Sequence, residues 1–237
     1  MEYFSQFGQD RFIDEVVMRG KTGGVFVEIG AYDGVTFSNT LFLERYRGWT
    51  GLCVEPNPMQ WDALQRNRSA RCRQVCIGDR DETIKFRMVQ GPTGVGMLSG
   101  RTDAGGTKAE ERIEREQGTV TIVDVPCITF ERLMREEGIS NADYISIDAE
   151  GHDFAILRAI DLARGPACIT MEENHDYFAV RRYVQRFGYR IAEKLQADYI
   201  IVRGDVAGAM GGVGLLSRSN RLRRYGKTLL RRLRLQS

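Results

Sequence analysis

The chain has 237 residues, of which 34 are Lys or Arg and 32 are Asp or Glu, so its formal net charge is only +2. This length suffices for one domain with a sizeable core and short extensions. The five cysteines show no framework of paired spacings, and the chain has neither an apolar signal core at its start nor a run of eighteen apolar residues. These features exclude a disulfide scaffold, a signal peptide and a membrane-spanning helix, and they predict a cytoplasmic protein.

The first half of the chain alternates apolar runs of strand type with stretches of helical spacing. In chain order we expect a helix over residues 8–19, a strand at 25–29, a helix from Thr36 or Ser38 to about Tyr46, a strand at 52–55, a helix from Pro58 to about Asn67, and strands at 74–77 and 83–89. This order favours a parallel sheet that is covered by helices.

The second half resumes the same alternation after residue 120. We expect a strand at 120–125, a helix at 129–137 ended by Gly138, a strand at 144–148, a helix over about 152–162, a strand at 168–172, a helix at 177–187 ended by Gly188, and closing strands at 189–195 and 198–203. The expected fold class is therefore α/β, with a mostly parallel, seven-stranded, doubly wound sheet, a β addition and a long insertion.

The insertion is the segment 91–119, which contains seven glycines, one proline and a charged run at 108–116. It is too long for an ordinary connection, so it is either a substrate lid with a short helix or a mobile segment. Three parts follow: an entry helix segment at 1–24, the main domain at 25–205, and a Gly-rich linker with a basic tail at 206–237.

Two acids close apolar runs in the first third of the chain. Glu28 lies in a strand that runs into a turn with Gly30, Asp33 and Gly34, and the next strand ends at Glu55. An acid about 20 residues beyond such a turn binds ribose hydroxyls in doubly wound folds. The turn lacks the G-x-G-x-x-G that holds a pyrophosphate, and its acids favour a cationic or neutral ligand. S-adenosylmethionine (SAM) fits, because it joins a ribose to a sulfonium and an amino group.

Later predicted strands also end in polar residues. Asp79 follows the third strand, Asp-Ala-Glu-Gly occupies 148–151, and Glu-Glu-Asn-His occupies 172–175. Open parallel sheets bind ligands beyond the carboxyl ends of their strands, so these residues are expected along one rim.

Together these residues resemble the SAM-dependent methyltransferases of the FkbM type. The resemblance covers residues 3–203 and is carried by the segments Ser5–Asp10, Val27–Gly34, Val54–Asn57, Asp143–Gly151 and Glu172–His175. It implies a Rossmann-like class I methyltransferase fold and methyl transfer to a hydroxyl, commonly on a sugar or a polyketide-derived product. It also implies that Glu28, Gly30 and Gly34, with Asp33 beside them, hold the methionine end of SAM, that Glu55 binds the ribose, that Asp79 binds the adenine amino group, and that Gln9 and Asp10 close over the methionine carboxylate or the substrate.

A hydroxyl acceptor must lose its proton, either to a general base or with help from a metal that lowers its pKa. His175 is the first base candidate and His152 the second, and Asp148 and Glu173 complete the expected catalytic group. The metal alternative is Mg²⁺ held by the oxygen ligands Asp148, Glu150, Glu173 and Asn174, and the remaining alternative is that these acids only position SAM or substrate.

The C-terminal residues 218–237 carry eight Arg or Lys and no acid, which leaves 26 bases against 32 acids in the rest of the chain. Leu222, Leu229 and Leu233 fall on one face of a helix there, a pattern typical of docking at an anionic bilayer. A peripheral position at the inner face of the membrane is thus expected, with a helix folded onto the body or an unstructured end as alternatives. The acidic body argues against nucleic acid as a partner.

The expected function is O-methylation of a hydroxyl on a sugar, a lipid-linked glycan or a related natural product. Two other classes remain open: a nicotinamide-dependent oxidoreductase on a related fold, which the missing glycine motif and Glu28 disfavour, and a non-catalytic nucleoside-binding protein. Binding of SAM or of NAD would separate these classes.

Overall fold

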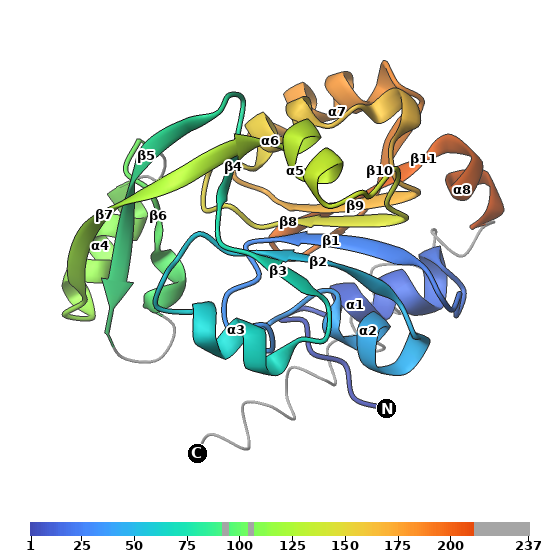
Figure 1. The fold of residues 1–237 in the computed structure, drawn as a ribbon. Coiled ribbons are helices and arrows are strands. Elements are labelled where there is room, and N and C mark those ends of the chain that lie inside the picture. The colour runs from blue at the N-terminus through green and yellow to red at the C-terminus, as the bar shows by residue number, and fades with distance from the viewer. Residues whose placement is uncertain (92–94, 104–106, 211–237) are drawn as a thin grey trace.

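The centre of the molecule is a seven-stranded sheet in the order β10-β11-β9-β8-β1-β2-β3 (Figure 1). The computed structural model describes residues 1–91, 95–103 and 107–210. The five strands from β3 to β9 in this order are parallel, whereas β11 is antiparallel to β9 and β10 is antiparallel to β11. The strands are β1 Val25–Ile29, β2 Thr50–Val54, β3 Arg71–Arg73, β8 Tyr144–Ile147, β9 Cys168–Glu172, β10 Tyr189–Leu195 and β11 Asp198–Arg203.

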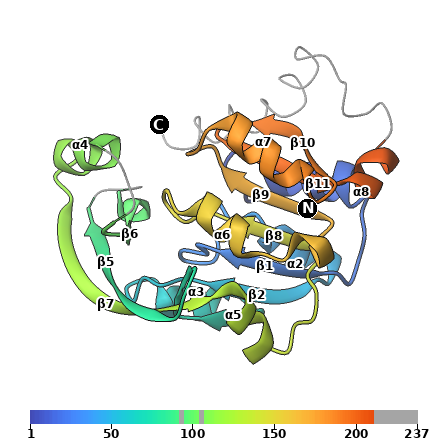
Figure 2. The ribbon, with the colours of Figure 1, turned by 90° about the horizontal axis from the view of Figure 1, so that it is seen from above.

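Helices cover both faces of this sheet (Figures 1 and 2). One face carries α1 Gln9–Phe12 with its π-helical continuation η1 Ile13–Val17, α2 Leu41–Arg47 and α3 Trp61–Asn67. The other carries α5 Phe130–Glu136, α6 Asp153–Ala159 and α7 Tyr177–Gln185. In the chain, η3 Leu162–Arg164 follows α6, and α8 Gly204–Ala209 follows β11.

The central strand β1 is buried on both sides, which explains its continuous apolar sequence. Phe26 packs in a cluster with Phe12 and Leu41 from the first helical layer. Val27 and Ile29 pack in a second cluster with side chains of the opposite layer, such as Leu157.

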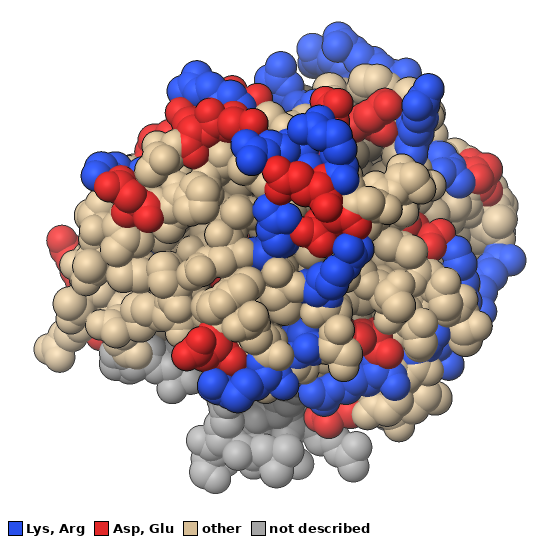
Figure 3. Space-filling model, viewed as in Figure 1, with Lys and Arg blue, Asp and Glu red and all other residues tan. Residues whose placement is uncertain are grey.

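A second, four-stranded sheet extends to one side, in the order β4-β7-β5-β6 (Figure 2). Its strands are β4 Cys76–Gly78, β5 Glu82–Gln90, β6 Gly100–Arg101 and β7 Thr119–Thr129. In the view of Figure 3 this side of the molecule is mainly uncharged, whereas Lys, Arg, Asp and Glu gather over the main sheet and its helices. Val120 and Ile122 of β7 are 45% and 49% exposed.

The described part of the insertion folds against β5. It contains η2 Gly96–Leu98, strand β6 and α4 Thr107–Arg115. Val89, Val95 and Ile113 form a small buried cluster that joins these pieces. The described residues of this segment therefore pack against the second sheet and extend it.

The α/β class predicted from the sequence is confirmed, in the form of two mixed sheets. The strand expected at 74–77 was assigned to the wrong sheet. The strand β3 of the main sheet ends at Arg73, and the next strand, β4, pairs with β7 of the second sheet through Cys76↔Cys127. Apolar alternation reports burial and does not identify the neighbouring strand. The helix expected from Thr36 or Ser38 begins at Leu41: the Thr40 hydroxyl donates to Glu28, and the Ser38 hydroxyl donates to Glu28 while it accepts from Leu41 N at 3.1 Å.

The predicted basic tail at 218–237 lies outside the described residues. Among the residues that are described, no helix has the length and apolar character needed to cross a membrane.

Candidate functional site

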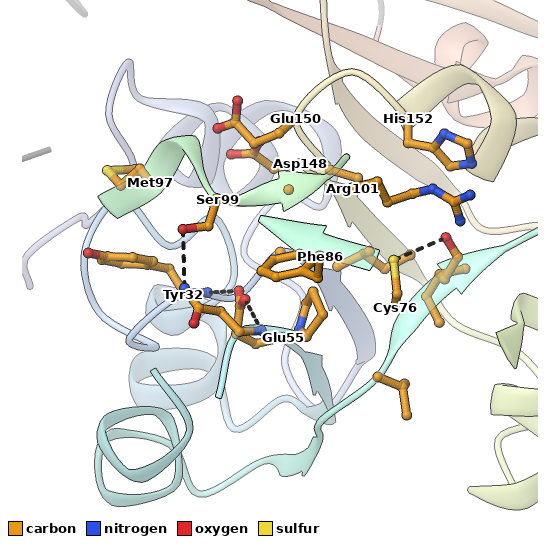
Figure 4. Close-up of a pocket in the computed structure, with 18 of the residues that line it drawn as sticks. Tyr32, Glu55, Cys76, Phe86, Met97, Ser99, Arg101, Asp148, Glu150 and His152 are labelled. Carbon is orange, nitrogen blue, oxygen red and sulfur yellow. Dashed lines mark hydrogen bonds between the residues drawn. The ribbon is translucent and has the colours of Figure 1, made fainter. Parts of the chain in front are cut away.

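A cavity lies beyond the carboxyl ends of β1, β2 and β8 (Figure 4). The main sheet contributes Gly30, Glu55 and Asp148 to its wall, and the second sheet contributes Phe86 and Arg101. We call this the inner cavity. Its position at the strand ends is the one that open parallel sheets use for ligands.

A wider cleft adjoins the inner cavity and shares Tyr32, Gly96, Met97, Asp148 and Glu150 with it. We call this the outer cleft. Its remaining wall comes from the N-terminal segment, the loop after β1, the start of α3 and the insertion, and includes Gln6, Phe7, Gln9, Phe37, Asn39, Gln60, Gln90 and Arg112. A molecule in the inner cavity and another in the outer cleft would therefore meet beside Asp148 and Glu150.

The Glu55 carboxylate is fixed in the inner cavity by two backbone N–H groups. Oε1 accepts from Asn57 N at 2.8 Å, and Oε2 accepts from Tyr32 N at 2.8 Å. Tyr32 adopts φ 48°, a left-handed conformation that costs energy in any residue except glycine. Burial raises the pKa of Glu55 to about 7. Each carboxylate oxygen keeps a lone pair, so Glu55 can still accept hydrogen bonds from two ligand hydroxyls.

Gly30 allows the ends of β1 and β8 to approach each other. Its φ is 82°, and an added Cβ would lie 1.8 Å from the carbonyl oxygen of Asp148. No side chain fits there without moving one strand end. Gly34, with φ 83°, is packed in the same way against Arg68, whose Cγ would lie 2.7 Å from an added Cβ. These two predicted glycines therefore shape the turn.

Two carboxylates at the junction of the two spaces have no protein partner. Neither Asp148 nor Glu150 accepts a hydrogen bond or forms an ion pair with the described residues. Burial raises the pKa of both, and nearby acids add to the effect, chiefly Glu150 for Asp148 and Glu172 for Glu150; the pKa of Glu150 reaches about 8. Glu172, with a pKa raised by burial to about 7, and Asp198 extend this acidic wall in the outer cleft. The wall favours a cation.

Asp153, the first residue of α6, holds the turn that carries these acids. Its carboxylate accepts from Ala149 N at 3.1 Å and from Gly151 N at 3.2 Å, and it also accepts from the Asn174 amide. Glu150 adopts φ 47° within this turn. A left-handed backbone at a half-buried acid is the type of strain that gathers at functional sites.

Glu28, expected at the methionine end of SAM, lines neither space. Its Oε1 accepts from Ser38 Oγ at 2.9 Å and Asn39 N at 2.8 Å, and its Oε2 accepts from Thr40 Oγ1 at 2.8 Å and Arg68 Nη1 at 2.6 Å. These bonds use the acceptor capacity of the carboxylate. We therefore revise its role: Glu28 fixes the loop that carries Asn39 into the outer cleft.

The N-terminal residues Gln9 and Asp10 have different positions. Gln9 lines the outer cleft, and its amide donates to the Asp198 carboxylate. Asp10 is fully buried and accepts from Phe4 N at 2.5 Å and from Ser5 Oγ at 2.5 Å. Asp10 therefore folds the N-terminal segment, and Gln9 faces the space where a ligand would lie.

Asp33 and Asp79 also differ from each other. Asp33 lies in the wall of the outer cleft, but its carboxylate accepts from Val35 N at 2.9 Å and from Thr36 N at 2.7 Å, so it shapes the loop. Asp79 is exposed and lines neither space, because the strand before it belongs to the second sheet. The structure does not bring Asp79 to the expected adenine position.

The residues after β9 do not gather as predicted. Glu173 is exposed and paired with Lys194 and with Tyr199 Oη at 2.8 Å, and His175 packs against Phe154, with Nδ1 at 2.8 Å from Asn174 Oδ1. No three His, Cys, Asp or Glu side chains in the described residues are arranged to hold a metal ion. The expected Mg²⁺ site of Asp148, Glu150, Glu173 and Asn174 is thus not supported, since Glu173 and Asn174 are engaged elsewhere.

Several residues of the site were missed from the sequence. Phe86 and Arg101 belong to segments whose strand pairing was unknown, so nothing placed them at the cavity. His152, the second base candidate, does line the inner cavity, and burial lowers its pKa. The Asn39 Oδ1 atom is buried without a hydrogen-bond partner within the described chain and belongs to a residue of the outer cleft. A free buried acceptor beside acids again suits a cationic donor.

Comparisons with known proteins identify the family of this chain. No curated protein matches the sequence. Among solved structures, the chain is similar to the methyltransferase FkbM from Methylobacillus flagellatus KT, with 12% identity and a TM-score of 0.47, over 76% of this chain and 43% of that one. The chain thus spans less than half the length of that protein. The family model described as methyltransferase FkbM domain matches residues 28–191, well over half of the chain. The chain belongs to the FkbM methyltransferase domain family.

Proposed function

We propose that this protein is an S-adenosylmethionine-dependent O-methyltransferase that acts on a hydroxyl of a sugar, a lipid-linked glycan or a related natural product. The observation that carries the proposal is the pair of unpartnered carboxylates, Asp148 and Glu150, where the inner cavity meets the outer cleft. Members of this family generally use SAM, and a methyltransferase must bring a sulfonium and its acceptor together at one point.

The inner cavity suits the adenosine part of SAM. Glu55 has a spare lone pair on each oxygen for the ribose hydroxyls, and the apolar side chains of Phe86, Ile77 and Val75 line the space for an adenine ring. The methionine end would then reach the acidic wall, where Asn39 Oδ1 and the Asp148 carboxylate can accept from its ammonium group. SAM supplies a methyl group that is already activated by the sulfonium, so the chain mainly has to align it.

The outer cleft suits a hydroxylated acceptor. Its wall combines the side-chain amides of Gln6, Gln60 and Gln90, which both donate and accept hydrogen bonds, with the rings of Phe7 and Phe37. Sugars need this combination of polar contacts and flat apolar surfaces.

Glu150 is the side chain best placed to take the proton of the acceptor hydroxyl. It lines both spaces, and its pKa of about 8 lies close to neutrality, where a general base is effective. His175, the base expected from the sequence, lines neither space. His152 lies in the inner cavity, on the side occupied by Arg101 rather than in the outer cleft.

Ligand-dependent melting tests the proposal. SAM and S-adenosylhomocysteine should raise the melting temperature of the full chain, because a ligand that binds only the folded state stabilises it, and NAD should not. Glu55→Gln should reduce the rise, whereas Asp79→Asn, at an exposed acid outside the cavity, should leave it unchanged. A rise with NAD alone would favour the oxidoreductase class, and no rise with any of the three would favour a non-catalytic protein.

A further inference from the structure

The outward side of α7 is rich in arginine and lies outside the candidate site. On the inward side, Val180 and Val184 are fully buried in the core beneath the helix. The exposed residues gather on the opposite side, at the spacing of a single helix face. They are Phe178, Arg181, Arg182, Gln185 and Arg186. We call this the α7 face.

The positive charge of the α7 face is not balanced by ion pairs. None of its arginines forms an ion pair with a residue that the structure describes, and the segment 177–190 contains four arginines and no acid. Arg158 of α6 adjoins the face, because its carbonyl oxygen accepts from Tyr183 Oη at 3.2 Å, and it is exposed and equally unpaired within the described chain.

The two acids that precede α7 are engaged by other groups. Glu173 is paired with Lys194, and Asp176 caps the helix by accepting from Ala179 N at 2.8 Å. Figure 3 shows Lys and Arg side chains along the upper edge of the molecule, where Figure 1 places α7. The α7 face is therefore complementary in charge to an anionic partner.

An exposed aromatic ring stands between the arginines. Phe178 is 64% exposed, and Phe187, which follows α7, is 40% exposed. Arg181 and Arg182 lie one turn after Phe178, on either side of its line along the helix. Helices that lie in a membrane interface combine their side chains in this way, because the ring enters the apolar boundary while the guanidinium groups stay at the phosphates.

The start of α7 lies beside the outer cleft. The preceding strand, β9, ends at Glu172 in the wall of that cleft. The ring of Tyr177 contacts that of Tyr199, with centroids 5.8 Å apart, and the neighbouring Asp198 belongs to the same wall. A partner that covers Phe178 would therefore lie next to the cleft.

We propose that the α7 face docks on an anionic lipid bilayer, with Phe178 at the level of the headgroups and the arginines of the face, together with Arg158, at the lipid phosphates. The helix then lies in the plane of the surface, and docking holds the outer cleft at the bilayer. For the proposed methyl transfer this favours a lipid-linked glycan over a free sugar as the acceptor, a step that rests on the proposed function.

The test measures co-sedimentation of the full-length chain with phosphatidylcholine vesicles that contain or lack phosphatidylglycerol. Binding is expected only to the anionic vesicles, and it should weaken as salt is added. The triple variant Arg181→Gln, Arg182→Gln, Arg186→Gln should bind them about 100-fold more weakly, or about fivefold for each arginine.

The matched control removes the same charge on the other side of the main sheet, in the triple variant Arg19→Gln, Arg45→Gln, Arg66→Gln. All six arginines are exposed and both triples keep the basic residues 218–237, so total charge and tail are the same in the two proteins. The control should bind nearly as the wild type does. Equal weakening of the two triples would overturn the proposal, as would equal binding to neutral vesicles.

A tryptophan reporter locates the contact. The fluorescence of Phe178→Trp, after subtraction of the wild-type signal, should shift to the blue on addition of anionic vesicles, because the ring leaves water. Tyr46→Trp, at a ring 40% exposed on the opposite helical layer, should show no shift. An unshifted Phe178→Trp, or an α7 face that binds single-stranded RNA and no vesicle, would contradict docking. None of these readouts requires SAM, so if S-adenosylhomocysteine fails to raise the melting temperature, only the acceptor step is lost.

Discussion

Two groups of acids lie against the main sheet, and they differ in what balances their charge. Under the loop after β1, Arg68 forms ion pairs with Glu28 at 2.6 Å and with Glu44 at 2.8 Å. In the cleft, neither Asp148 nor Glu150 forms an ion pair within the described chain, and Arg112 and Arg87 act on Glu150 only from a greater distance. We call the first group the Arg68 network and the second the cleft acids.

The difference separates acids that build the site from acids that face a ligand. A buried charge with a good partner is tolerated and holds the surrounding loop, whereas an unpartnered one makes the folded chain less stable until a cation binds. The Arg68 network therefore predicts loss of stability on substitution, and the cleft acids predict loss of binding or turnover with stability kept or gained.

The largest expected effect is that of Arg68→Met. Its guanidinium side chain is fully buried, and its removal leaves Glu28 and Glu44 without a counter-charge. Breaking a buried ion pair on one side costs about 3–5 kcal/mol, so the free energy of unfolding in urea should fall by that amount. Arg71→Met is the matched control, since the Arg71 side chain is 55% exposed in its pair with Glu137. Equal losses in the two variants would remove the distinction.

The next effect is on turnover, in Glu150→Gln. The amide keeps the size of the side chain but cannot accept the acceptor proton, so the rate should fall at least about 10²-fold. The affinity for S-adenosylhomocysteine should change much less. His175→Asn, outside both spaces, should retain the wild-type rate. A slower His175 variant beside an unaffected Glu150 variant would restore the histidine as the base.

Much of the fold could be predicted from the sequence, because its elements are long apolar runs with clear ends. The strands at 25–29, 144–148 and 168–172 agree with β1, β8 and β9 within one residue, and the helix expected at 129–137 agrees with α5, which Thr129 caps through Arg132 N. The strands of the second sheet were expected, but their pairing was missed because the partner of β4 is β7, about 50 residues later. Local pattern contains no information about such long-range pairing.

The site shows the same limit at the level of single residues. Glu28 and Glu55 have the same sequence signature, an acid near the end of an apolar run, yet one binds Arg68 and the other faces the inner cavity. The alternation of side chains along β1 and the position of Arg68, 40 residues away, decide between these outcomes. Phe86 and Arg101 could be assigned to the inner cavity only after the strand pairing of the second sheet was known.

Asp148→Asn should have a smaller effect than the preceding variants, and unlike Arg68→Met it should make the ligand-free chain more stable. Removing one of several like charges should raise the melting temperature of the ligand-free chain, since Glu150, Asp153 and Glu172 all disfavour its ionised form. The same change should weaken SAM binding by about tenfold, or about 1.4 kcal/mol, because a charge-assisted contact is lost. S-adenosylhomocysteine lacks the sulfonium charge, so its affinity should fall less. A lower melting temperature would place Asp148 with the Arg68 network.

The smallest effect is the pH dependence of the ligand-free chain. The pKa of Glu150 is raised to about 8 and that of Glu172 to about 7, both from 4.5, so between these values the folded state binds more protons than the unfolded state. Unfolding then releases protons, and the stability that these groups contribute below pH 4.5 is lost as the pH rises toward 8.

The melting temperature should therefore decline between pH 5 and pH 8, and the double variant Glu150→Gln, Glu172→Gln should decline less. Saturating SAM should oppose the decline, because its positive groups bind the ionised carboxylates most strongly where the empty cleft is least stable. A decline of equal slope in the wild-type chain with and without SAM would mean that the cleft acids do not face the cation.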